Sequence, residues 1–149
     1  MMIRRLERAD YNQIIELLKD FAWQTEFTKL KREVYDYEHV KQVLLRCEKT
    51  GLSFVAQDDA SITGCILSIL VPDMWVPEIV RLRELAWFVL PEYRNQGLGD
   101  QLYMAYCQSA EQWRRQGRIT GYTMSRLSTT PRKEYHDFKL VEQTYMVGA

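Results

Sequence analysis

The sequence predicts a single α/β domain in which helices cover a β-sheet. Runs of β-branched and aromatic residues are interspersed with segments whose apolar residues recur at helical spacing. At 149 residues, the chain is long enough to bury a core of its own. No linker, repeat or low-complexity tract divides it, so we assign residues 1–149 to one domain.

The first 24 residues are expected to form a strand and then a helix. Residues 2–9 are expected to form the strand. Asp10 has the residue type of a helix N-cap, and Gln13 is its expected partner in a capping box. The apolar residues of the helix recur every three or four positions: Tyr11, Ile14, Leu18 and Phe21.

A second helix is expected after an irregular stretch at residues 25–35. Asp36 is its predicted cap and Gly51 its predicted end, because glycine commonly follows the last helical residue. Its inner face is expected to carry Val40, Val43, Leu44 and Cys47.

Three strands are expected next. Residues 52–71 contain two β-rich runs on either side of the polar turn 57–61, which is the pattern of a hairpin. Pro72 and Pro77 then interrupt the sheet, because proline cannot donate to a ladder. Residues 79–90 form the third predicted strand, which is apolar enough at its end to be buried on both faces.

The clearest helix of the sequence spans residues 97–117. Its inner stripe comprises Leu98, Leu102, Tyr106, Ala110 and Trp113. A strand at 119–127, a helical turn at 131–137 and a closing strand at 139–147 follow. The predicted order is therefore β-α-α-β-β-β-α-β-α-β.

The strand at residues 79–90 changes its pattern in the middle. Val80 and Leu82 alternate with arginines, but the apolar positions resume at Leu85. The alternation therefore shifts by one residue around Arg83–Glu84. Either a β-bulge, a feature common beside active sites, or a strand end buried on both faces explains this shift.

Composition and charge limit the function classes. Twenty basic residues balance twenty acidic ones, which argues against a nucleic acid or an anionic membrane as partner. No apolar run reaches the roughly 18 residues of a membrane helix, and the N-terminus lacks a signal-peptide core, so a cytoplasmic protein is expected. Cys47, Cys65 and Cys107 match no metal-ligand spacing and lie in apolar surroundings, so we expect buried thiols and no metal.

The stretch VLPEYRNQGLGD, residues 89–100, joins the third strand to the clearest helix. Gly97 and Gly99 lie in the turn, where glycine permits unusual backbone angles and a close approach to a ligand. The first amides of a helix lack internal partners and lie at its positive end. With Arg94 nearby, this turn is expected to bind phosphate. Its spacing matches neither the Rossmann fingerprint nor a P-loop.

This turn resembles the acyl-CoA-binding motif of the GNAT superfamily, the acetyl-CoA-dependent N-acyltransferases. The pattern Val-x-Pro-x-x-Arg-x-x-Gly-x-Gly is matched by Val89, Pro91, Arg94, Gly97 and Gly99. The family's element order also fits nearly the whole chain. The resemblance implies a GNAT-type mixed, mostly antiparallel sheet flanked by helices, with acetyl-CoA in a cleft between two splayed strands.

The resemblance also implies which residues bind acetyl-CoA. In the family, the end of the motif strand pairs with the pantetheine arm, while the turn and the helix start hold the pyrophosphate. The corresponding residues here are Phe88, Val89, Leu90, Arg94, Asn95, Gln96, Gly97, Leu98, Gly99 and Asp100.

In the family, an amine attacks the thioester directly after losing a proton. Glu84 is the candidate base, because the family commonly places a carboxylate on this strand facing the cleft, where burial would raise its pKa. The alternative is a salt bridge from Glu84 to Arg81 or Arg83.

Tyr135 is the candidate acid that protonates the leaving thiolate. The family has a tyrosine five residues before the phenylalanine of a Gly-Phe pair, whereas Tyr135 is three residues before Phe138 and Asp137 replaces the glycine. Ser125 is the fallback for this role, and a half-buried packing tyrosine is the alternative explanation of Tyr135.

The acceptor site is expected at residues 25–35 and 72–78, with candidate lining residues Trp23, Phe27, Trp75 and Arg81. The expected function is transfer of an acetyl group to a small-molecule amine or a protein amino group in a ternary complex. Two alternatives are a catalytically silent GNAT-fold protein that binds acyl-CoA or regulates a partner, and an unrelated nucleotide-binding domain. The sequence leaves a homodimer open.

Overall fold

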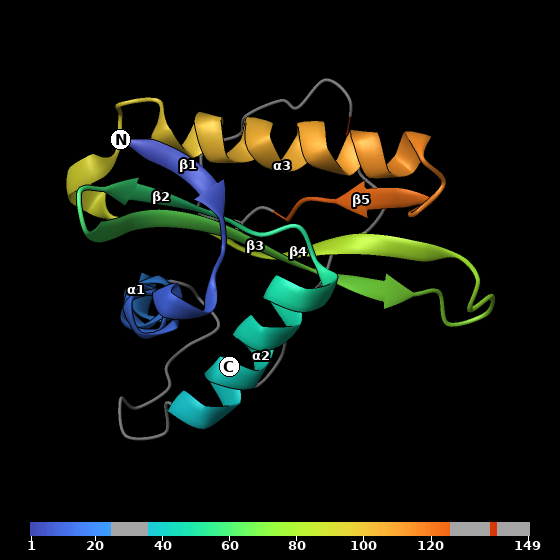
Figure 1. Cartoon of the computed structure of the whole chain (residues 1–149), viewed down its shortest axis with the longest axis horizontal. Helices are drawn as coiled ribbons and strands as arrows, with labels where there is room; N and C mark the ends of the chain where they lie inside the picture. Colours follow the sequence, from blue (N-terminus) through green and yellow to red (C-terminus); the bar gives the residue numbers. More distant parts are fainter. Residues whose placement is uncertain (25–35, 126–137, 140–149) are drawn as a thin grey trace.

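The computed structural model describes residues 1–24, 36–125 and 138–139, and in them a five-stranded sheet lies between helices (Figure 1). The strands occur in the order β1 (Met2–Arg5), β2 (Phe54–Asp58), β3 (Ser61–Pro72), β4 (Val80–Val89) and β5 (Gly121–Thr123). Neighbouring strands are antiparallel except β4 and β5, which are parallel. This is the mixed, mostly antiparallel sheet that the sequence predicts.

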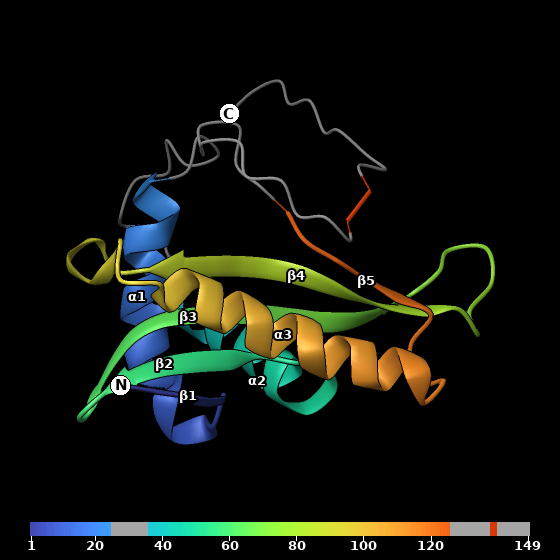
Figure 2. The same cartoon turned by 90° about the horizontal axis from the view of Figure 1, so that it is seen from above.

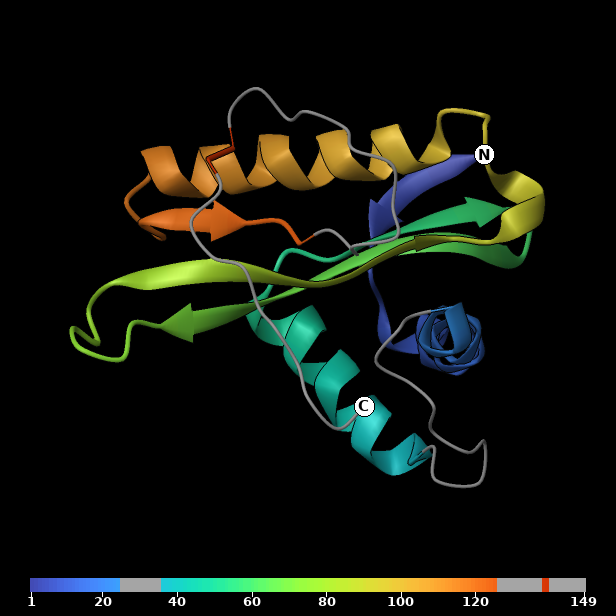
Figure 3. The same ribbon diagram turned by 180° about the vertical axis from the view of Figure 1, so that it is seen from behind.

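Helices cover both faces of the sheet. One face carries α3 (Leu98–Arg115), and the other carries α1 (Tyr11–Gln24) and α2 (Tyr37–Thr50) (Figures 1 and 3). Each face has its own core cluster. The predicted helical stripes are confirmed, with Tyr106 fully buried under α3, although Trp113 is only partly buried.

The two predicted helix caps have different outcomes. Asp36 caps α2 as predicted. The Asp10–Gln13 capping box is wrong, because a 3-10 turn, η1 (Arg8–Asp10), precedes α1. The carboxylate of Asp10 accepts the N–H of Glu7 at 2.9 Å and forms a buried ion pair with Arg4 at 2.7 Å. Gln13 instead bonds to the turn between β2 and β3.

Of the two explanations for the shifted alternation on β4, the β-bulge is confirmed. The register shifts where Ser68 lies opposite Glu84, so Leu85 has no partner on β3. Leu82 belongs to the core under α3, whereas Ala86, four residues later, belongs to the core under α1 and α2. An uninterrupted strand would place both residues on one face. The bulged residue, Leu85, is 39% exposed.

Two buried serines stabilise the β3 side of this bulge. The Oγ of Ser68 accepts the N–H of Leu52 at 2.9 Å and donates to the carbonyl of Leu52 at 2.6 Å. The Oγ of Ser53 accepts the N–H of Ser68 at 3.0 Å. The two side-chain hydroxyls thus satisfy the backbone groups of Leu52, just before β2, and the N–H of Ser68 at the bulge.

Replacing Ser68 with alanine is expected to lower the free energy of unfolding by about 1–3 kcal/mol, because the buried N–H and carbonyl of Leu52 would lose a partner. Urea unfolding measures the change. Ser61→Ala, at the exposed start of the same strand, is the control and should stay within about 0.5 kcal/mol of the parent. Equal stability of Ser68→Ala and the parent would show that the hydroxyl does not support the bulge.

The predicted hairpin of β2 and β3 is confirmed, and β5 is shorter than the strand predicted at 119–127. The predicted helical turn at 131–137 lies outside the described residues, as does the predicted closing strand apart from Lys139. Over the described ranges, no helix is long and apolar enough to cross a membrane.

Candidate active site

The strands β4 and β5 pair over only three residues and then diverge (Figure 2). Arg81–Arg83 lie beside Gly121–Thr123, whereas β4 continues to Val89. In the part of the chain that the structure describes, no strand pairs with the outer edge of β4 from Glu84 to Val89. An unpaired strand edge is the kind of surface to which an extended ligand can pair like an additional strand.

Glu84 lies at the point where the two strands part. Its side chain is buried, with the residue 5% exposed, and its Oε2 accepts the N–H of Ser125 at 2.9 Å. Burial raises the pKa of Glu84 to about 7, and the hydrogen bond from Ser125 opposes this rise. A carboxyl group with this pKa can accept a proton near neutral pH.

The salt bridge that was the alternative for Glu84 does not form. Arg81 instead donates to a carboxylate oxygen of Asp73 at 2.9 Å, and Arg83 is exposed. Over the described residues, neither arginine makes an ion pair with Glu84. A single backbone N–H is thus the hydrogen-bond donor that the structure assigns to this carboxylate.

The turn after β4 has the backbone geometry of an anion cradle. A 3-10 turn, η3 (Pro91–Tyr93), leads into it, and Asn95 and Gly97 have φ angles of 62° and 78°. Gly97 is the N-cap of α3 and contributes no capping side chain. The N–H of Gln101 bonds to the carbonyl of Gly97 at 3.0 Å, so the amides of residues 98–100 precede the first such bond of the helix.

Two side chains tie this turn to the end of β4. The Nε of Arg94 donates to the carbonyl of Val89 at 2.9 Å, and its guanidinium lies 5.2 Å from the ring centre of Phe88. The indole of Trp87 donates to the carbonyl of Gly99 at 3.2 Å. Trp87 is not among the predicted site residues, because its spacing in the sequence does not distinguish it from other core aromatic residues.

The residues expected to bind acetyl-CoA lie in one continuous stretch from the end of β4 to the first turn of α3. Phe88, Val89 and Leu98 are buried and anchor the stretch in the core. Asn95, Gln96 and Asp100 are exposed on the turn. The exposed turn thus follows directly on the strand that carries the buried carboxyl group of Glu84.

Of the expected acceptor residues, Trp75 and Arg81 are linked through Asp73 near the loop between β3 and β4. Trp75 is 81% exposed in the loop between β3 and β4, which projects beyond the rest of the sheet (Figure 2). Asp73 pins this loop by accepting the N–H of Trp75 at 2.8 Å and by its bond to Arg81. Trp23 lies at the end of α1. Phe27 and Tyr135 lie outside the described residues.

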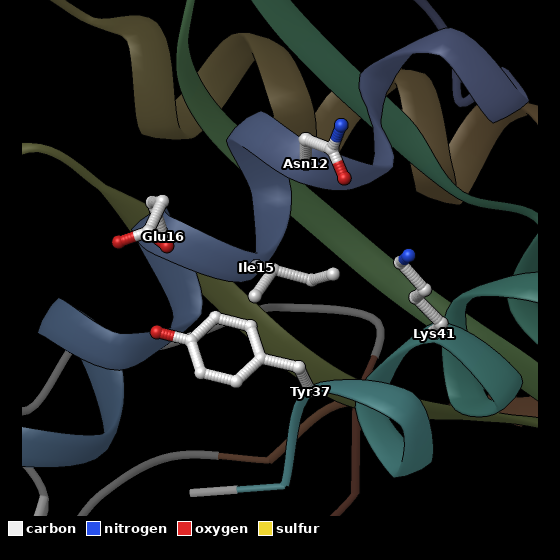
Figure 4. Close-up of a pocket in the computed structure, with 5 residues that line it drawn as sticks. All are labelled: Asn12, Ile15, Glu16, Tyr37 and Lys41. Atoms are coloured by element: carbon white, nitrogen blue, oxygen red, sulfur yellow. The ribbon is translucent and has the colours of Figure 1, made fainter.

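A pocket of about 230 Å³ lies between α1 and α2 (Figure 4). Its lining residues are Asn12, Ile15, Glu16, Tyr37 and Lys41. The wall is formed by an isoleucine and a tyrosine ring, with a carboxylate and an ammonium group around them. None of these described lining residues belongs to the expected acceptor region at 72–78.

Cys47 and Cys65 offer no activated thiol. Cys47 and Cys65 are buried and Cys107 is partly buried. Burial raises the pKa of Cys47 to about 11, and it raises the pKa of Cys65 as well, so both thiols stay protonated at neutral pH. Within the described ranges, no three His, Cys, Asp or Glu residues are grouped so that they could hold a metal ion.

This fold, with its mixed sheet, its diverging strands β4 and β5 and the glycine turn at the start of α3, is that of an acyltransferase. The family described as the acetyltransferase (GNAT) family matches residues 10–128. The chain therefore belongs to the GNAT acetyltransferase family, as the motif at residues 89–99 indicated. Among curated protein sequences, none matches this chain.

Solved structures support the same fold. A possible acetyltransferase from Clostridium difficile 630 has a TM-score of 0.66 and 17% identity, with 95% of this chain and 98% of that chain covered. A ribosomal-protein-alanine N-acetyltransferase from Brucella melitensis biovar Abortus 2308 has a TM-score of 0.60 and 12% identity, with 87% and 83% covered. AAC(6')-Iy, in complex with the bisubstrate analog CoA-S-monomethyl-acetylneamine, has a TM-score of 0.59 and 17% identity, with 86% and 80% covered. At these identities the likeness concerns the fold alone.

Proposed function

We propose that the protein is an N-acetyltransferase that transfers the acetyl group of acetyl-CoA to a primary amine by direct attack in a ternary complex. The observation that carries this proposal is the position of Glu84. It is a buried carboxyl group at a β-bulge, where β4 and β5 part, on the strand that leads into the glycine turn. Membership of the GNAT family supports the acetyl donor.

The spacing of the site suits a long and narrow ligand. Glu84 and Val89 are five residues apart on an extended strand, which corresponds to about 17 Å. A ligand that reaches both the carboxylate and the turn must therefore be extended. We assign the pyrophosphate of CoA to the amides of residues 98–100 and the pantetheine arm to the edge of β4 at 88–90.

Acetyl-CoA supplies an acyl group activated as a thioester. Glu84 accepts the proton that the amine loses, and its pKa of about 7 balances basicity against the fraction that is ionised at neutral pH. We assign proton donation to the leaving thiolate to Tyr135, with Ser125 as the fallback. Because the thiols of Cys47 and Cys65 stay protonated, neither is acylated on this route, and direct attack needs no acylated cysteine.

The acceptor is a small-molecule amine or a protein amino group, and we propose that Trp23, Phe27, Trp75 and Arg81 contact it. Two of the similar structures support these two acceptor classes. One is named a ribosomal-protein-alanine N-acetyltransferase, and the other contains a bisubstrate analog derived from neamine. Both names imply an acceptor that presents an amino group.

A thermal shift experiment tests the donor. Acetyl-CoA and CoA are each expected to raise the Tm by several degrees at about 100 times their Kd, whereas ATP and NAD at equal concentration should not. Release of free CoA thiol is then followed with neamine and with peptides that begin with alanine. Failure of acetyl-CoA to raise the Tm would contradict the proposal. Binding without turnover on any amine would favour the silent acyl-CoA-binding protein.

A further inference from the structure

Tyr106 of α3 carries a buried hydroxyl group that the proposed reaction does not use. The residue is fully buried, and its hydroxyl donates to the backbone carbonyl of Thr123 at 3.0 Å. Its ring packs edge-on against Tyr122, with ring centres 6.0 Å apart. A buried hydroxyl with such a partner fixes the position of the group it bonds.

Thr123 is the last residue of β5, and it pairs with Arg83 of β4. Two residues later, the N–H of Ser125 donates to Glu84. In the described part of the chain, β5 makes no ladder pair with β4 after Thr123. The bond from Tyr106 therefore holds the chain immediately before the donor that reaches Glu84.

We propose that Tyr106 is a positioning residue, whose hydroxyl clamps the end of β5 so that the N–H of Ser125 stays on the carboxylate of Glu84 and favours its charged form. This inference rests on the proposed role of Glu84 for its effect on catalysis. The effect of Tyr106 on the ionisation of Glu84 can be measured whether or not the protein is catalytically active.

Few other groups compete with this hydrogen bond. In the described ranges, burial and the charge of Glu84 raise the pKa of Cys65 on β3 and that of Tyr106 on α3, so both groups are neutral at pH 7 and neither competes with Ser125 for the carboxylate. On its own strand, Arg81 is paired with Asp73 and Arg83 is exposed. Weakening the bond from Ser125 would therefore raise the pKa of Glu84, because burial would act with less opposition.

The test is Tyr106→Phe, which keeps the ring and removes the hydroxyl. Thermal unfolding first establishes that the variant is folded. The side-chain carboxyl carbon of Glu84, assigned by its absence in Glu84→Gln, is then titrated by NMR. We expect its midpoint to rise by about 0.5–1 pH unit, and we expect faster hydrogen exchange at the amide of Ser125. The acidic limb of the pH–rate profile should move by the same amount while the high-pH plateau stays nearly unchanged.

Tyr122→Phe is the matched control, because the hydroxyl of Tyr122 lies 3.4 Å from Glu111 and not at the end of β5. It should leave the midpoint of Glu84 unchanged. An unchanged midpoint and unchanged Ser125 exchange in Tyr106→Phe would overturn the clamp even if Glu84 is the base. A raised midpoint without a change in the pH–rate profile would support the clamp and instead contradict the proposed role of Glu84.

Discussion

Glu84→Gln is expected to lower turnover by about 10²–10⁴-fold, since this is the usual contribution of a positioned acid–base group. Glutamine preserves the shape and can still accept the N–H of Ser125, but it cannot take a proton. The parent should show an acidic limb with a midpoint near the Glu84 pKa of about 7, and the variant should lack it. Initial rates against pH, with an amine found by screening, measure both effects.

The same substitution has a stability effect of known sign. The pKa of Glu84 in the folded protein, about 7, is above its ordinary value of 4.5, so folding favours the protonated form. The parent therefore loses stability as the pH rises from about 4.5 to about 7, by on the order of 3 kcal/mol. Glu84→Gln lacks this loss, and its Tm should exceed that of the parent at pH 8 and nearly equal it at pH 4.

Glu92→Gln is the control, because it also removes one carboxylate, from the exposed turn η3 that follows β4. It should change neither the acidic limb nor the pH dependence of the Tm. If the acidic limb persists in Glu84→Gln while the stability difference appears as expected, Glu84 is a buried carboxyl group without a part in proton transfer.

Local pattern was enough to predict the three helices and the hairpin of β2 and β3, whereas β1 ends at Arg5 and not at residue 9. The stripe containing Leu102 and Tyr106 marks a helix with one buried face, and the shifted alternation after Leu82 marks the bulge. Each of the two signals is carried by residues that lie close together in the chain. The cap at Asp10 could not be predicted in this way, because an ion pair with Arg4 and a 3-10 turn compete for its carboxylate.

The parts of the candidate site that could be predicted are those where the residue type alone determines the backbone conformation or the chemistry. Gly97 has a positive φ angle, which favours glycine, and Glu84 places a carboxyl group at a bulge. The environment of Glu84 was not predictable, because its donor is a backbone N–H of a residue 41 positions away. Any residue type other than proline at position 125 would supply that N–H, so the identity of residue 125 does not indicate the hydrogen bond to Glu84.

Gly97→Glu is expected to weaken the binding of acetyl-CoA by on the order of 100-fold or more. The new carboxylate would lie at the N-terminus of α3, where we place the pyrophosphate, and like charges repel there. Loss of two charge-assisted hydrogen bonds at about 1.5 kcal/mol each already corresponds to about 3 kcal/mol, or more than 100-fold in Kd. Isothermal titration calorimetry with acetyl-CoA measures the change.

Two controls separate charge from backbone strain in this prediction. Gly97→Gln places a side chain at the same positive φ angle, and so adds the same backbone strain, but carries no charge. It should lose less affinity for acetyl-CoA than Gly97→Glu. Gly117 has a nearly equal φ angle of 74°, lies after the other end of α3 and has open space at its Cβ, as Gly97 has. Gly117→Glu should therefore lower stability to a similar extent and leave the affinity for acetyl-CoA unchanged. If Gly97→Glu and Gly117→Glu bind acetyl-CoA as tightly as the parent, the pyrophosphate is bound elsewhere than at the glycine turn.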